Sequence, residues 1–184
     1  MKLNLISLST VKTQLGISDG TYDSEITAMI PIVSSDVRRI LGTNYDCYMS
    51  AYITISEATI NLSTYNLEPA LPMGQVIYNP NIPDDTYLQS YDPDTGEYTM
   101  SSTATDTDYY IYPTVLVTQW PAISKMIWYR IDKQSTSSVS DETLKAYSVG
   151  PISKTYADSE INKQYNYPEI LIRDLGIPFA LVGK

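Results

Sequence analysis

The side chains of this chain that could do chemistry are carboxylates, and they gather in its middle third. Asp92, Asp94 and Glu97 lie around Gly96 in a spacing similar to the start of a calcium-binding loop. The remaining ligands of such a loop, and its bidentate glutamate, are missing. We therefore interpret the segment as a hairpin turn and expect no metal site there.

Other kinds of active site have even less support in the composition. The 184 residues include no histidine, and Cys47 is the single cysteine. This excludes a Ser-His-Asp triad, a Cys-His pair, histidine-bound metal and a disulfide within the chain. We expect no enzyme, no catalytic residue, no cofactor and no metal.

The net charge of −9 is distributed unevenly. Between Arg39 and Lys125 the chain has ten acidic residues and no lysine or arginine, whereas the remainder has 12 basic and 11 acidic residues. A surface with this charge repels phosphates, so the middle segment is not expected to grip nucleic acid. The aromatic content is also unusual, with 17 tyrosines and one phenylalanine, and tyrosine suits half-buried surfaces and subunit contacts.

Residues Thr21 to Gly42 give the clearest periodic signal and predict a long amphipathic helix. Its start is expected to be capped by Thr21 or Asp19, and Gly42 suits a left-handed stop. Pro31 lies opposite the apolar stripe, where we expect a bend on the solvent side rather than a break.

Three further helices are predicted. The first runs from Ser7 to Gly16, and a short one is expected between Tyr167 and Leu175. The third helix follows from apolar residues at helical spacing, which are Leu116, Trp120, Ile123, Ile127 and Ile131. Pro121 allows two interpretations: one long helix bent there, which we prefer, or an extended segment from Thr114 to Trp120 followed by a helix.

The segment 45–110 has the alternation and the punctuation of strands and turns. Its best hairpin pairs 86–91 with 97–101, and a short later strand is expected at 152–156. The predicted fold is α+β, a small bundle of three to four helices with an inserted β-rich hairpin region and a short C-terminal strand. The predicted domains are a helical core of 1–44 and 111–184, and an acidic, tyrosine-rich β insertion of 45–110.

This order of elements resembles the head-tail connector (adaptor or head-completion) proteins of tailed bacteriophages. The similarity lies in the short helix 8–16, the acidic start and Arg-Arg-Ile-Leu-Gly end of the long helix, the Ile-Trp-Tyr-Arg130 segment, and the Ser-Val-Gly-Pro-Ile-Ser-Lys run before Thr155. It covers roughly 3–44 and 111–176, and each element in it is a packing signature. The β insertion departs from the short connection usual in that family.

The resemblance implies a virion structural protein at the head-tail interface, assembled in the host cytoplasm. Its copies would form a ring, commonly a dodecamer, between the portal protein and a tail or stopper protein. The ring would extend the channel through which DNA passes without sequence-specific binding. No catalysis and no membrane are implied, and the sequence has no apolar stretch near the roughly 20 residues of a membrane span.

Side-by-side assembly requires residues outside the core stripes. The subunit-interface candidates lie on the long and third helices and are Ile32, Arg38, Arg39, Met126, Trp128 and Tyr129. For the apolar ones, a wider core face is the open alternative. The family's use of its C-terminal region for contacts suggests portal or neighbour docking by Phe179, Leu181 and Val182. Folding of this apolar tail back into the core is the open alternative.

Two other functional hypotheses remain. The first is a β-rich module that binds a ligand or glycan on a helical scaffold, since exposed tyrosine and aspartate are suited to such a surface. The second is a carboxylate-based hydrolase, because glycoside cleavage requires only two acidic groups. The acidic residues show no recognisable pairing, so the hydrolase is the weaker of the two.

Overall fold

A computed structural model describes residues 3–42, 48–54, 56–62, 71–136, 146–149, 152–155, 161–162 and 165–176. The chain divides into two compact units, each built from two separated stretches of sequence. The β unit comprises Met1–Ser7 and Asn44–Thr118, and the helical unit comprises Leu8–Thr43 and Gln119–Lys184. These units differ from the predicted domains in that 1–7 and 111–118 belong with the strands.

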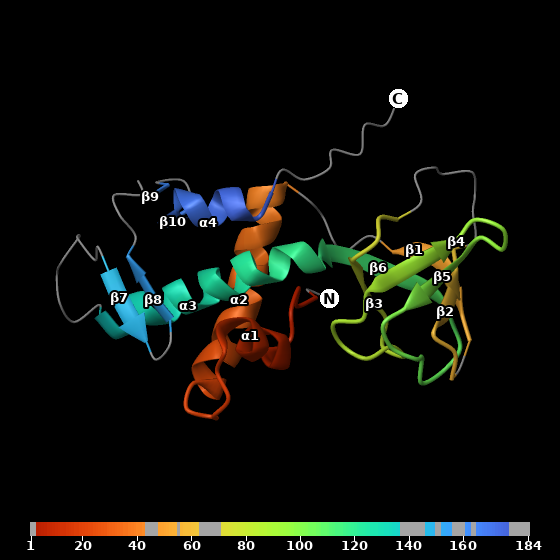
Figure 1. Cartoon of the computed structure of the whole chain (residues 1–184), viewed down its shortest axis with the longest axis horizontal. Coiled ribbons are helices and arrows are strands. Elements are labelled where there is room, and N and C mark those ends of the chain that lie inside the picture. The colour runs from red at the N-terminus through yellow and green to blue at the C-terminus, as the bar shows by residue number, and fades with distance from the viewer. Residues whose placement is uncertain are drawn as a thin grey trace. The chain divides into compact units, whose positions relative to one another are not determined.

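The helical unit centres on α3, which packs against α1, α2 and α4 (Figure 1). Two short antiparallel strand pairs, β7 with β8 and β9 with β10, complete its described part. Its helices are α1 (Leu8–Leu15), α2 (Asp23–Leu41), α3 (Trp120–Thr136) and α4 (Glu169–Asp174). Its strands are β7 (Ala146–Val149), β8 (Ile152–Thr155), β9 (Ile161–Asn162) and β10 (Tyr167–Pro168).

Helix α2 confirms the prediction made from its periodicity. One stripe, from Ile26 to Leu41, is buried, and Pro31 lies inside the helix on its exposed side. Gly42 takes the left-handed conformation with φ 62°, and its N–H bonds to the carbonyl of Arg38. The predicted cap is wrong, because the N-cap position is Tyr22 and makes no side-chain capping bond.

The preferred long, bent third helix is also wrong. Residues Asp108–Leu116 form β6, a one-turn 3-10 helix η1 (Val117–Gln119) follows, and α3 begins at Trp120. The helical spacing between Leu116 and Trp120 is a coincidence, because Leu116 ends β6 and Trp120 begins α3. Pro121 therefore lies in the first turn of α3, where the missing N–H has no intrahelical partner to lose.

The β unit is a six-stranded antiparallel sheet in the order β3-β6-β1-β2-β5-β4. The predicted hairpin is confirmed as β4 and β5, with Gly96 at φ 73° in the turn. The strands are β1 (Met49–Ile53), β2 (Thr59–Asn61), β3 (Gln75–Tyr78), β4 (Leu88–Asp92), β5 (Glu97–Met100) and β6 (Asp108–Leu116).

The two end strands of this sheet approach each other. The Gly74 N–H donates to the carbonyl of Leu88 at 2.8 Å, and the Ile77 N–H donates to that of Thr86 at 2.9 Å. A β-bridge joins Val76 to Tyr87. The sheet is therefore a nearly closed, barrel-like structure (Figure 1).

This barrel-like sheet has its own apolar interior. The core residues are Ala51, Ile53, Ile60, Leu62, Ile77, Ile82, Leu88, Tyr98, Met100, Ala104 and Ile111. The predicted helical bundle with an inserted hairpin region is therefore wrong, because the strands enclose a core of their own rather than decorating a helical one. In β1 and β5 the buried residues alternate with exposed ones, as expected for strands with one face on the interior.

The first residues of the chain belong to the β unit. Leu3, Leu5 and Ile6 are buried. The backbone N–H of Ser7 donates to both carboxylate oxygens of Asp85 at 3.1 Å, and its hydroxyl bonds to the same carboxylate. The N-terminal segment is thus fixed to the loop before β4, 78 residues away in sequence.

Candidate functional site

The predicted interface residues of α2 lie at different depths. Ile32 is 45% exposed, and the side chain of Arg39 is 57% exposed. Arg38 is half-buried. Ile32 follows the exposed Pro31, so α2 carries a small apolar surface opposite its buried stripe.

The predicted interface residues of α3 are buried within the helical unit. Met126, Trp128 and Tyr129 are at most 8% exposed. The ring of Trp128 meets that of Tyr22 edge-on at 5.0 Å, and Tyr129 packs against Tyr167 at 5.9 Å. Because α1, α2 and α4 all pack on α3, its apolar face is wider than one stripe.

The predicted docking residues Phe179, Leu181 and Val182 lie outside the described residues. Their role in docking to the portal or to a neighbouring subunit therefore stays a prediction.

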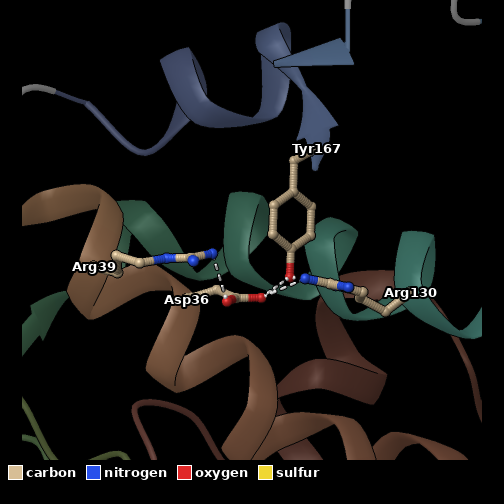
Figure 2. A network of polar contacts seen from close by, with 4 residues as sticks. All are labelled: Asp36, Arg39, Arg130 and Tyr167. Carbon is tan, nitrogen blue, oxygen red and sulfur yellow. Dashed lines mark hydrogen bonds and ion pairs between the residues drawn. The ribbon is translucent and has the colours of Figure 1, made fainter. Parts of the chain in front are cut away.

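The helical unit contains a polar network that connects three of its elements (Figure 2). The Asp36 carboxylate on α2 accepts hydrogen bonds from Arg130 Nη2 of α3 at 2.8 Å and from the Tyr167 hydroxyl of β10 at 2.7 Å. Arg130 Nε donates to the Tyr167 oxygen at 2.9 Å. The other oxygen of Asp36 accepts from Arg39 Nη2 at 3.1 Å.

Burial and hydrogen bonding together set the pKa values of Tyr167 and Arg130. Burial raises the pKa of Tyr167, the hydrogen bond to Asp36 adds to this effect, and the hydrogen bond from Arg130 opposes it. For Arg130, burial alone would lower the pKa, but the bonds to Tyr167 and Asp36 outweigh it and raise the pKa. Tyr167 therefore remains a neutral donor and Arg130 a full cation, which fits a charge-assisted structural lock.

The β unit carries a second cluster, four tyrosines on the outer face of three adjacent strands. We call Tyr48, Tyr78, Tyr110 and Tyr112 the tyrosine platform. The ring of Tyr112 lies 6.3 Å from Tyr48, 6.4 Å from Tyr78 and 5.7 Å from Tyr110. Tyr48 also meets Tyr110 at 6.4 Å. These distances and the steep angles between the rings are those of contacting aromatic side chains.

A carboxylate lies beside the platform, held by two asparagines. Asp108 Oδ2 accepts from Asn79 Nδ2 at 2.9 Å and from Asn81 Nδ2 at 3.1 Å. Asn79 is fully buried and also donates to the carbonyl of Tyr110 at 2.8 Å. Desolvation raises the pKa of Tyr110, and the nearby charge of Asp108 raises it further.

In the turn between β4 and β5, Asp92 forms a hydrogen bond within the turn itself. The Asp94 N–H donates to the Asp92 carboxylate at 2.9 Å, which lowers the pKa of Asp92, with a smaller effect from Thr95. No group of three or more potential ligands that could hold a metal occurs in the part of the chain that the structure describes. Among the described helices, none has the length and apolar character needed to cross a bilayer.

Sequence reasoning found neither the network nor the platform. Asp36 lies between the buried stripe of α2 and its polar side, and its partners Arg130 and Tyr167 are 94 and 131 residues away. The signal for the platform was present in Tyr109-Tyr-Ile-Tyr112, where Ile111 faces in and its two neighbours face out, but the pairing strands were not identifiable locally.

The fold and these two clusters define the described chain as a two-unit protein whose side chains form a structural lock in one unit and an aromatic surface on the other. No family model, no curated protein and no solved structure matches this chain.

Proposed function

We propose that this protein is a virion structural protein of a tailed bacteriophage, a connector that forms a ring between the portal vertex and the tail. The ring extends the DNA channel, and its partners are further copies of the chain, the portal protein and a tail or stopper protein. It performs no catalysis. The order of the helices in the sequence supports this proposal.

The observation that carries the proposal is the outer side of α2. The stripe from Ile26 to Leu41 is used by the helical unit itself, yet Ile32 remains 45% exposed on the other side, beside the exposed Pro31. Ring formation requires two different faces on each subunit, because head-to-tail contacts join one face to another. An apolar surface left free by the subunit's own core supplies one of them.

The charge distribution supports a role around DNA. Ten acidic residues and no basic residue lie between Arg39 and Lys125. A channel that must let a duplex move cannot hold its phosphates, and a basic lining would do so. An acidic surface leaves the duplex free to slide.

The experiment is native mass spectrometry of the full chain, alone and with the portal protein, followed by electron microscopy. The expected result is a closed ring, and Ile32→Arg is expected to shift the mass toward monomers. The matched control is Ile170→Arg, an isoleucine on α4 that is 37% exposed. A wild-type chain that stays monomeric at every concentration and binds neither portal nor tail protein would overturn the proposal. Equal assembly of both variants in a closed ring would overturn only the assignment of α2.

A further inference from the structure

The tyrosine platform follows from the register of three strands. Tyr78 of β3 pairs directly with Tyr112 of β6. On the other side of β6, Met49 pairs with Ile111, which places Tyr48 next to Tyr112. Since alternate residues of a strand point to opposite faces, the burial of Ile111 in the core directs Tyr110 and Tyr112 outward.

One ring of the platform is largely exposed, and the other three are partly exposed. Tyr48 is 67% exposed, and Tyr78, Tyr110 and Tyr112 are half-buried. A separate pair on β1 and β6, Tyr52 and Tyr109, has rings 5.6 Å apart and is 46% and 68% exposed. Single exposed aromatic residues are common on protein surfaces, whereas contiguous ones mark contact sites. The core of the β unit lies behind them and does not use these rings.

The charge around the platform selects the occupant. Within the helical unit, the chain's own cations cover tyrosine rings: Arg130 lies 4.7 Å from the ring of Tyr167, and Lys133 lies 5.1 Å from that of Tyr129. Between Arg39 and Lys125 the sequence has no cation that could do the same. Asp108 lies next to the platform, because its carboxylate and the carbonyl of Tyr110 accept from the same Asn79 amide. An aromatic face with a carboxylate beside it attracts a cation both by the quadrupole of the ring and by charge.

We propose that the tyrosine platform binds an arginine- and lysine-bearing segment of a partner protein. The rings receive the cationic side chains on their faces, and Asp108, oriented by Asn79 and Asn81, attracts the same cations. The chemistry of this surface is the same whether or not the chain forms a ring. A negative result for cation binding would therefore leave the connector proposal standing, and a negative result for ring formation would leave this one standing.

The test uses the full chain and fluorescein-labelled hexa-arginine, hexa-lysine and hexa-glutamate peptides, with binding followed by fluorescence anisotropy at low and high salt. Binding of both basic peptides, and none of the acidic one, is expected. Each exposed ring is expected to contribute about a two- to five-fold gain in affinity. The double variant Tyr48→Thr with Tyr112→Thr should therefore bind about ten-fold more weakly, since threonine preserves the preference for a strand.

Two variants separate the rings from charge and from folding. Tyr48→Phe keeps the ring and removes the hydroxyl, so it should bind the basic peptides as the wild type does. Tyr91→Thr is the matched control, because Tyr91 is 42% exposed on β4 of the same unit and is not part of the platform. Circular dichroism confirms that each variant is folded before it is titrated.

Three results would overturn the proposal. The first is basic-peptide binding that the double variant and Tyr91→Thr reduce equally, since the attraction would then be general to the acidic unit. The second is no binding of the basic peptides at low salt. The third is salt-independent binding of neutral oligosaccharides that Tyr48→Phe weakens, which would assign the platform to a glycan instead.

Discussion

Tyr167→Phe tests whether the Asp36 network holds the helical unit together. The hydroxyl of Tyr167 donates to Asp36 at 2.7 Å and accepts from Arg130 at 2.9 Å, and both partners are charged. Phenylalanine keeps the ring and its packing, so the loss is confined to these two bonds. Hydrogen bonds to charged groups contribute about 1.5–3 kcal/mol, and the partial exposure of Arg130 favours the lower half of that range, so we expect a loss of about 2 kcal/mol.

The assay is equilibrium unfolding in urea followed by tryptophan fluorescence. Both tryptophans, Trp120 and Trp128, lie in α3, so the signal reports on the helical unit. The matched control is Tyr129→Phe, whose ring lies 5.9 Å from that of Tyr167 and whose buried hydroxyl has no hydrogen-bond partner among the described residues. Removing that hydroxyl should leave the free energy of unfolding unchanged or slightly higher.

A double-mutant cycle gives the coupling within the network. Asp36→Asn deprives Arg130 of its countercharge and the Tyr167 hydroxyl of a charged acceptor. Combining it with Tyr167→Phe should cost about 1 kcal/mol less than the sum of the single changes, because both act on the same charge-assisted bond. Additive effects, or equal losses for Tyr167→Phe and Tyr129→Phe, would refute the view that Asp36 joins α2, α3 and β10.

Three further outcomes are expected. Gly42→Ala should lower the free energy of unfolding by about 1 kcal/mol in the same urea assay, because φ is 62° there and an alanine is strained in that conformation. The new methyl group meets nothing within 4 Å, so the loss is due to the backbone, and Gly20→Ala, with φ outside the positive range, should be near neutral. Asn79→Ala should destabilise the β unit by about 2 kcal/mol, because Asp108 and the Tyr110 carbonyl lose the fully buried amide that donates to them. The near-ultraviolet circular dichroism of tyrosine measures this loss, and Asn61→Ala, at an exposed position, is the control. Because burial raises the folded-state pKa of Tyr167 above its usual 10.0, the neutral hydroxyl stabilises the fold fully below pH 10.0, and this contribution is lost as the pH rises from there through the raised value; Tyr167→Phe should show a smaller loss of stability over the same range.

Local patterns predicted the elements whose partners are close in sequence. Helix α2 was identified because its stripe repeats over five turns, and the β4–β5 hairpin because proline, aspartate and glycine specify the turn between adjacent strands. The wrong prediction of a continuous helix across 108–120 has a physical cause. A strand that leads into a helix without a break presents one continuous apolar pattern, so Leu116 and Trp120 have a helical spacing although they belong to different elements.

Local sequence patterns did not predict which distant strands pair with one another. Strand β6 pairs with β1 and β3, which are separated from it by other strands, and nothing in the sequence of β6 states which neighbours it has. The network at Asp36 is similar, because a half-buried aspartate on a helix is indistinguishable in sequence from a solvated one. The candidate surfaces depended on this tertiary information and therefore emerged with the structure.

The meeting of β3 and β4 has a consequence for how this protein avoids unwanted association. An open antiparallel sheet ends in strands whose unpaired backbone groups can recruit a strand from another molecule, which leads to aggregation or domain swapping. Here the N–H groups of Gly74 and Ile77 already bond to the carbonyls of Leu88 and Thr86. The β unit thus offers a binding partner its side chains in place of a free backbone edge. The β unit can therefore expose aromatic side chains while the backbone groups where β3 meets β4 stay paired.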